Sequence, residues 1–285
     1  MCKCGLPVML LLLGMGPWAV AQTATCDKLE GEAKALAQKL LASQYMYDCC
    51  DQAIGECLKA KPTCRLAVRL ANNICRRVAD KQDEATIVRG LAKRARSMSR
   101  GKKYEIDLKP EVAARVGSDA AKVVLVEYAC ARCPFCSKVT PLLHKEVLDG
   151  RLKDKVRFYL KVFPIRSHEF SKETGLGFMA AITMGRFWAF ALHSYAHFDN
   201  FCIKQQTAWA KAVGLDVEGF ERLLKDPATR KLLVESKKEG LRNKVDATPA
   251  FYINGRKYVG DMDIEELVDI SLEEAERVEG LVHVP

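Results

Sequence analysis

Two cysteines separated by two residues, Cys133 and Cys136, are the side chains whose type and spacing most clearly indicate chemistry. The apolar run Val123 to Val126 precedes them and has the composition of a strand buried on both faces. Apolar residues at helical spacing follow them and predict a helix that begins at the motif. We therefore expect both thiols at a junction between a buried strand and a helix.

The position of Cys133 in front of the helix favours a reactive thiolate. Pro134 fits the first helical turn, where a missing N–H costs no hydrogen bond. Cys133 would face unpaired N–H groups and the positive end of the helix dipole, which lower a thiol pKa from roughly 8.5 towards neutrality. Cys136, one turn later, would be the shielded resolving thiol. Paired CxxC motifs also bind zinc, so half of a metal site is the alternative interpretation.

The strand, the Cys-Pro-Phe-Cys motif and the helix together resemble the active-site unit of the thioredoxin superfamily. The second signature of that superfamily is a cis-proline facing the cysteines, and the stretch Val245 to Gly255 matches it. Thr248-Pro249 is the candidate, because X-Pro bonds alone adopt the cis form at low cost. Asn254-Gly255 predicts a hairpin directly afterwards. A proline in an ordinary surface turn is the alternative.

Glu127 lies six residues before Cys133 and matches the buried carboxylate that thioredoxin-like proteins keep near the resolving cysteine. An acid within an apolar strand should have a raised pKa. Such a group could carry the proton of Cys136 during disulfide exchange. The alternative is a carboxylate at the exposed end of the strand.

Residues 1–21 resemble a secretory signal peptide, with Lys3, an apolar run and the small-x-small sequence Ala19-Val20-Ala21. A retained membrane anchor is the alternative. Twelve cysteines in the chain indicate an oxidising compartment, and we expect the periplasm. The net charge is +9, but lysine and arginine are spread through every segment. We interpret them as solvated helix faces and expect no nucleic-acid partner.

Residues 22–101 are expected to form a cysteine-rich helical domain and a linker, with apolar residues at helical spacing in three segments. The basic stretch Arg89 to Lys103 is the predicted linker, and Tyr104 to Leu108 the first strand. The six cysteines of this domain predict three disulfides that stabilise a small core. A metal or haem site is the alternative, although residues 22–100 lack histidine. Facing positions in a helical hairpin turning near Pro62 suggest Cys57–Cys64, Cys75 with Cys49 or Cys50, and the remaining vicinal cysteine with Cys26.

The region 102–285 resembles DsbA-like proteins. About seventy helix-prone residues, roughly 167–243, separate a predicted strand from the cis-proline candidate, and the run from Val162 to Ser171 is similar to the point where DsbA-like proteins insert a helical domain. The implied fold class is α/β, a thioredoxin-like fold with an inserted helical domain, preceded by a small disulfide-rich helical bundle.

This resemblance implies a thiol-disulfide oxidoreductase that acts on unfolded or reduced secreted proteins. Oxidised Cys133–Cys136 would accept a substrate thiolate at Cys133, and a second substrate thiol would resolve the mixed disulfide. Thr248 and Pro249 would bind the substrate backbone, because a proline starting a strand leaves a ladder position open. Pro134 and Phe135 are the other substrate-binding candidates. We expect no metal and no organic cofactor, and a membrane redox partner would reoxidise the pair.

The direction of exchange depends on the residues between the cysteines. The strongest oxidants of the family carry histidine there, whereas Phe135 cannot hydrogen-bond to the thiolate. We therefore predict a dithiol oxidase with a less oxidising couple than theirs. One alternative is a disulfide isomerase or reductase dimerised by the N-terminal bundle. The other is a non-enzymatic module in which the bundle docks a partner.

Four further side chains allow more than one interpretation. Cys130 and Cys202 could form a disulfide between the active-site loop and the inserted helices, or could both be buried free thiols. A redox role for Cys130, three residues before Cys133, is a third interpretation. His193 and His197 are four residues apart on a predicted helix, where they could share a metal. Ordinary packing is the alternative for these histidines.

Overall fold

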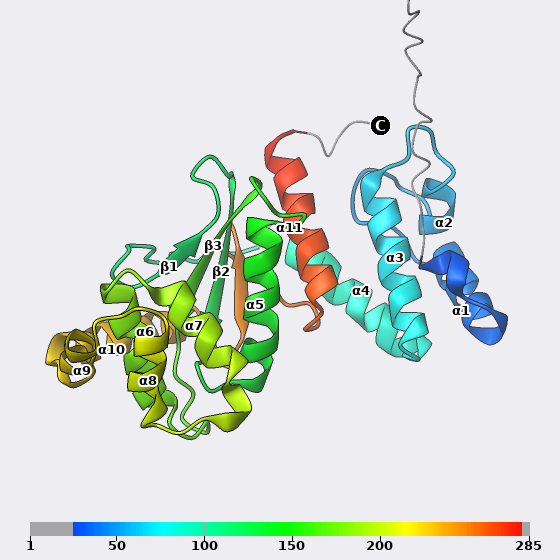
Figure 1. Cartoon of the computed structure of the whole chain (residues 1–285). Coiled ribbons are helices and arrows are strands. Elements are labelled where there is room, and N and C mark those ends of the chain that lie inside the picture. Colours follow the sequence, from blue (N-terminus) through cyan, green and yellow to red (C-terminus); the bar gives the residue numbers. More distant parts are fainter. Residues whose placement is uncertain (1–24, 100, 281–285) are drawn as a thin grey trace, which may run out of the picture.

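A computed structural model describes residues 25–99 and 101–280, so the predicted signal peptide lies outside the described residues. Its N-terminal part is a helical bundle, as predicted (Figure 1). Buried Leu40, Ile74 and Ile87 come from three different helices and form its core. The elements of the bundle are η1 (Cys26–Lys28), α1 (Gly31–Ser43), α2 (Ile54–Cys57), α3 (Arg65–Ala79) and α4 (Glu84–Met98).

Three disulfides stabilise the bundle, but the predicted pairing is wrong. The bonds are Cys26–Cys75, Cys49–Cys64 and Cys50–Cys57. The prediction assumed a long helix before Pro62, whereas the segment between α1 and α3 contains only the four-residue α2. Without two facing helices, residues at similar distances along the chain on either side of Pro62 do not lie opposite one another.

The third predicted helix of the bundle is present, and the linker that follows it is shorter than predicted. α4 continues to Met98, so most of the expected linker is helical. The segment 104–108 is not a strand of the sheet, although Tyr104 N donates to Gly255 O at 2.8 Å. The first strand begins at Ala114 instead.

The rest of the chain is a thioredoxin-like α/β domain, which confirms the predicted fold class. Its sheet has the order β1-β3-β2-β4-β5, in which β2 and β3 are parallel and the other pairs antiparallel. The central strand β2 is therefore covered on both edges, which agrees with its apolar sequence. The strands are β1 (Ala114–Val116), β2 (Val123–Ala129), β3 (Val156–Val162), β4 (Ala250–Ile253) and β5 (Arg256–Lys257).

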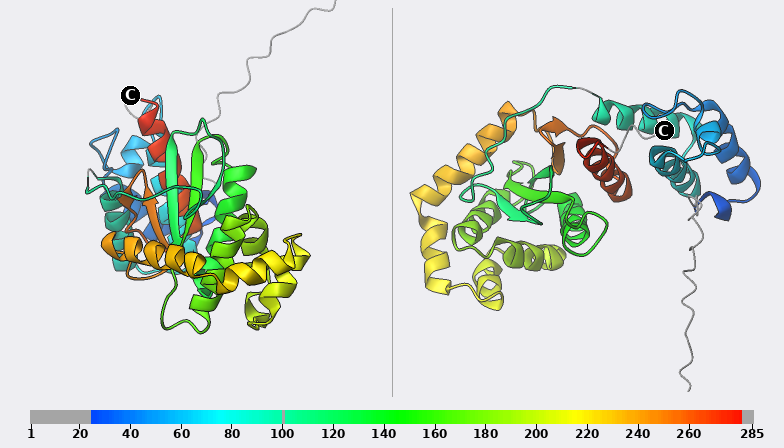
Figure 2. Two further views of the ribbon diagram at one scale, coloured as in Figure 1. Left: turned by 90° about the vertical axis from the view of Figure 1, so that its left-hand side faces the viewer. Right: turned by 90° about the horizontal axis from the view of Figure 1, so that it is seen from above.

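Helices cover both faces of the sheet (Figures 1 and 2). On one face, α5 (Pro134–Leu148) and α11 (Ile264–Val278) enclose a core that includes Leu125, Phe158 and Leu267. The other face packs against the inserted helices, as Gly240 against Phe163 illustrates. The insertion consists of α6 (Ser171–Thr183), α7 (Phe187–Ala196), η2 (Phe198–Asn200), α8 (Gln205–Ala212), α9 (Val217–Lys225) and α10 (Pro227–Arg242).

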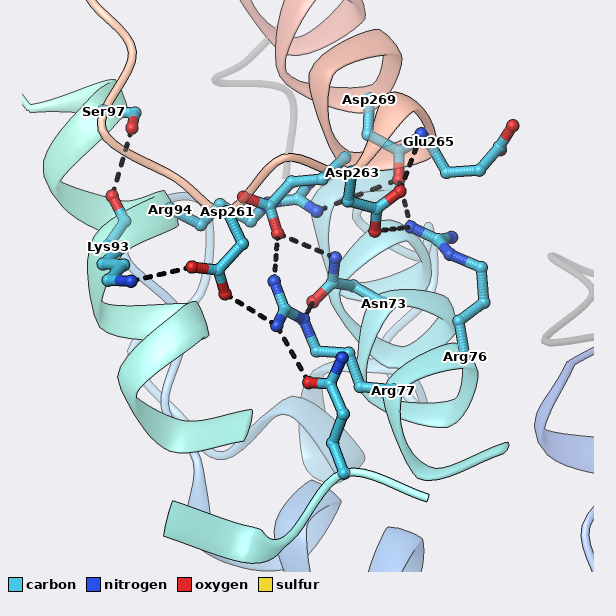
Figure 3. A network of polar contacts seen from close by, with 12 residues as sticks. Asn73, Arg76, Arg77, Lys93, Arg94, Ser97, Asp261, Asp263, Glu265 and Asp269 are labelled. Carbon is cyan, nitrogen blue, oxygen red and sulfur yellow. Dashed lines mark hydrogen bonds and ion pairs between the residues drawn. The ribbon is translucent and has the colours of Figure 1, made fainter. Parts of the chain in front are cut away.

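The bundle docks on α11 and on the loop before it through ion pairs, and Figure 3 shows those around Arg77 from close by. Arg77 of α3 binds Glu266 and Asp261 at 2.9 Å each. Arg94 of α4 is completely buried and pairs with Glu273. These arginines are therefore not the solvated side chains that the sequence suggested. The bundle is fixed to the domain that carries the Cys-Pro-Phe-Cys motif.

Candidate active site at the start of α5

Cys133 occupies the predicted junction between strand and helix. β2 ends at Ala129, a turn follows, and Cys133 is the N-cap residue of α5. Pro134 fills the first helical position, where its missing N–H has no consequence. The position next to the free N–H groups of α5 favours a negative charge on the sulfur.

The surroundings of Cys133 lower its pKa to about 5. The largest contribution is a hydrogen bond from the thiol of Cys136, and the backbone N–H groups of Cys136 and Phe135 add to it. Burial acts in the opposite direction but is the smaller effect, although the side chain is only 1% exposed. As a thiol, Cys133 donates to the carbonyl oxygen of Thr248 at 3.2 Å. At neutral pH, however, the thiolate dominates.

Cys136 has the opposite character. It is completely buried, and loss of solvation raises its pKa well above the ordinary value of a thiol. The hydrogen bond to Cys133 and the nearby carboxyl group of Glu127 raise it further. The two thiols therefore differ in ionisation: Cys133 is a thiolate near neutral pH, whereas Cys136 stays protonated, as a resolving cysteine requires.

Glu127 is buried in the middle of β2, between Leu160 of β3 and Phe251 of β4. Thr140 Oγ1 donates to Glu127 Oε1 at 2.7 Å, while Oε2 has no hydrogen-bond partner among the described residues. Burial raises the pKa of this carboxyl to about 8. The alternative of an exposed strand end is wrong, and the group can exchange a proton near neutral pH.

The proline loop lies opposite the cysteines. The Thr248–Pro249 peptide bond is cis, as the sequence predicts. Because Ala250 pairs with Tyr128, the start of β4 lies beside the end of β2, which brings this loop to Cys133. Phe135 is 61% exposed, and Pro134 is exposed beside it. Thr248 thus contacts the reactive sulfur directly, and Pro134 and Phe135 follow Cys133 in the chain.

Cys130 is a further thiol of the site, and the sequence interpretation overlooked one signal in its spacing to Cys133. Cys130-Ala131-Arg132-Cys133 is a second CxxC that overlaps the first. Cys130 is a buried free thiol, and its sulfur lies 3.4 Å from His168 Nδ1. Cys202 is free and exposed, so the expected Cys130–Cys202 disulfide is absent.

Within residues 25–99 and 101–280, no three or more His, Cys, Asp or Glu side chains are arranged to hold a metal ion. His193 and His197 pack ring against ring, with centroids 4.3 Å apart, and both contact Trp209. None of the helices in these two ranges has the length and apolar character of a membrane span.

Sequence comparison finds similarity over the domain that carries the site. Residues 110–270 match a family model described as thioredoxin. A curated relative, Na(+)/H(+) antiporter NhaA 1 of Mycobacterium sp. (strain KMS), is 26% identical over 155 residues. A second, NhaA 3 of Salinispora tropica, is 27% identical over 152 residues. These matches cover 53% of this chain but only 25% and 23% of the relatives.

Solved structures share the fold at low sequence identity. BdbD from Bacillus subtilis in its oxidised form has a TM-score of 0.53 and 17% identity, covering 62% of this chain and 100% of that one. Wolbachia pipientis α-DsbA1 has a TM-score of 0.51 and 16% identity, with 59% and 93% covered. The catalytic domain of Proteus mirabilis ScsC has a TM-score of 0.50 and 18% identity, with 66% and 97% covered.

Proposed function

Because this chain belongs to the thioredoxin family, we propose that it is a thiol-disulfide oxidoreductase that exchanges disulfides with protein substrates through Cys133 and Cys136. The observation that carries the proposal is the opposite acidity of these two thiols, one with a pKa of about 5 and the other raised well above normal. A low-pKa thiolate is a good leaving group, and a protonated partner is kept from premature reaction.

The exchange proceeds in two balanced steps. A substrate thiolate attacks Cys133 Sγ, the Cys133–Cys136 bond breaks, and Cys136 leaves and takes up a proton. Glu127, with a pKa of about 8 and a position next to Cys136, supplies that proton. The second substrate thiolate then attacks the substrate sulfur of the mixed disulfide and expels Cys133 as its stable thiolate. The substrate gains a disulfide and the protein gains two electrons.

The proline loop supports binding of an extended substrate. Thr248 Oγ1 is a buried polar atom without a hydrogen-bond partner among the described residues. Pro249, directly before β4, has no N–H and cannot donate a backbone hydrogen bond to a neighbouring strand, which leaves room for a substrate backbone at this position. In this proposal a substrate backbone lies along Thr248 and Pro249, and its apolar side chains rest on Phe135.

We assign the direction as dithiol oxidation, because every contact that stabilises the Cys133 thiolate stabilises the reduced form of the pair. The alternative of an isomerase or reductase dimerised by the bundle has less support. The face of the bundle formed by α3 and α4 is occupied by α11 of the same chain. Measuring the molar mass in solution together with the refolding of scrambled ribonuclease separates the two, since a dimer with isomerase activity would favour the alternative.

The partners and the compartment follow from the same proposal. The substrates are reduced or unfolded secreted proteins in the periplasm, and a membrane redox protein reoxidises Cys133 and Cys136. The three disulfides of the bundle agree with an oxidising compartment. A non-enzymatic docking module would not require a cysteine whose pKa is lowered to about 5.

The direct test is oxidation of a reduced peptide that carries two cysteines. Cys133→Ser should abolish the reaction, while Cys136→Ser should accumulate a mixed disulfide between Cys133 and the peptide. Cys202→Ser is the matched control, because this thiol is free, exposed and remote in sequence from the motif. Undiminished oxidation by Cys133→Ser would refute the proposal.

A further inference from the structure

A third thiol lies next to the redox pair. The chain from Cys130 to Cys133 is a turn closed by a hydrogen bond from Cys133 N to Cys130 O, at 3.1 Å. A turn closed in this way holds its first and fourth Cα atoms within about 7 Å. Disulfides join Cα atoms roughly 4.4–6.8 Å apart. The backbone therefore permits a bond between Cys130 and Cys133.

Cys130 also has a base. His168 Nδ1 lies 3.4 Å from Cys130 Sγ, and the backbone N–H of Arg132 donates to the same sulfur at 3.4 Å. Burial raises the pKa of Cys130, so this thiol needs a proton acceptor before it can react. A neighbouring imidazole is the group that activates cysteine nucleophiles in this way. Because His168 is only half-buried, it connects the enclosed thiol to solvent.

The surroundings restrict what Cys130 can attack. Its side chain is completely buried, and its sulfur contacts His168 and the N–H of Arg132, whereas the sulfur of Cys133 contacts Thr248 in the proline loop proposed to bind substrates. Tyr195 of α7 covers the same turn, and its hydroxyl donates to Cys130 O at 3.4 Å. Cys133, in contrast, belongs to the same core cluster and interacts electrostatically with Cys130. A disulfide at Cys133 is therefore the target within reach.

We propose that Cys130 is a third redox thiol that competes with Cys136 for Cys133. The inference rests on the proposed function, because it needs a mixed disulfide at Cys133. Cys130 transfers its proton to His168 and attacks Cys133 Sγ; the bond between Cys133 and the substrate breaks, and the substrate leaves as a thiolate. The new Cys130–Cys133 disulfide holds the two oxidising equivalents, and Cys136 stays reduced. This gives the protein a second way to release a trapped substrate.

The test uses glutathione disulfide as the probe and removes the competing thiols. Cys136→Ser, in a background with Cys202→Ser, is mixed with glutathione disulfide and quenched with acid over time. Peptide mapping by mass spectrometry then locates the bonds. The expected product is a transient glutathione adduct at Cys133 that converts to a Cys130–Cys133 disulfide. Adding Cys130→Ser, or Cys130→Ala as a second replacement, should leave the adduct stable. His168→Gln should slow the conversion by at least about tenfold.

The outcomes separate this inference from the function on which it rests. An adduct that forms at Cys133 and is equally long-lived with and without Cys130 would overturn the third thiol and leave the oxidoreductase intact. Absence of any adduct at Cys133 in all variants would overturn both. If His168→Gln forms the Cys130–Cys133 disulfide from the adduct at an unchanged rate, His168 does not accept the proton of Cys130 and the proposed step is wrong.

Discussion

At the scale of single residues, the site consists of three ionisable groups whose pKa values are shifted by burial and by a few hydrogen bonds. The types and positions of Cys133, Cys136 and Glu127 could be predicted from the sequence, because their spacing to one another is local. The contact between His168 and Cys130 could not, since His168 lies 38 residues from Cys130 in the chain and reaches the sulfur through the loop after β3. Contacts of that kind depend on tertiary packing that no short spacing encodes.

The buried carboxyl of Glu127 makes folding stability depend on pH. Its folded-state pKa of about 8 lies above the ordinary 4.5, so its neutral form is the one that the fold tolerates. The corresponding stability is fully present below about pH 4.5 and is lost as the pH rises through about 8. Urea unfolding at pH 5 and pH 9 should therefore show a loss on the order of a few kcal/mol that Glu127→Gln does not show. The exposed Glu235→Gln, as control, should behave like the wild type; a loss of the same size in Glu127→Gln would contradict the assignment.

The same carboxyl should matter for the exchange reaction. If Glu127 carries the proton of Cys136, Glu127→Gln should slow peptide oxidation at pH 7 by roughly 10²-fold or more. The pKa of Cys133 should move little, because its largest cause is the hydrogen bond from Cys136. Stopped-flow oxidation and the pH dependence of alkylation at Cys133 measure the two separately. An unchanged oxidation rate would exclude Glu127 as the proton carrier.

At the scale of elements, periodicity predicted the bundle helices, the buried strand β2 and the final helix, because each has an apolar face of its own. The prediction was wrong for the segment between α1 and α3, both in its helix and in its disulfide pairing. Its cysteines are tied by Cys49–Cys64 and Cys50–Cys57 in a largely irregular loop, where no repeating pattern indicates which residues face one another. Disulfide connectivity in such a loop is set by tertiary structure.

The observed connectivity predicts unequal effects of removing the bridges. Cys26–Cys75 spans 49 residues and Cys50–Cys57 spans seven, and a longer closed loop restricts the unfolded chain more. Replacing both cysteines of the longer bridge with serine should destabilise the bundle by about 1.5 kcal/mol more than the same change at the shorter one. Urea unfolding of the two double variants measures this difference. The reverse order would speak against this connectivity.

At the scale of the whole molecule, the bundle and the thioredoxin-like domain are joined by charge pairs across α11 (Figure 3). Arg77 and Glu266 are 189 positions apart, and Arg94 and Glu273 are 179 apart. Nothing in the sequence connects these side chains. From the sequence alone, the lysine and arginine residues of α3 and α4 are therefore interpreted as solvent-exposed. In the folded chain the arginines are buried against acidic partners, and the bundle packs on α11 of the thioredoxin-like domain.

Loss of Arg94 should release the bundle. Arg94→Ala removes the charged partner of the buried carboxyl group of Glu273 and leaves it only the hydrogen bond from the hydroxyl of Tyr47; breaking a buried ion pair in this way typically costs about 3–5 kcal/mol. We expect faster amide hydrogen exchange in α11 and α3, with the thiolate of Cys133 unaffected. Arg96→Ala on the same helix is the matched control, because Arg96 is exposed. Equal exchange in both variants would show that these pairs do not hold the bundle in place.

The reduction potential of the Cys133–Cys136 couple tests the central claim most directly. Equilibration with glutathione, followed by mass spectrometry of the alkylated protein, gives its value. The stabilised Cys133 thiolate predicts a potential clearly above the roughly −270 mV of reducing thioredoxins, and Phe135 places it below the roughly −120 mV of the strongest oxidants. A value at or below −270 mV would contradict the account and make the protein a reductase.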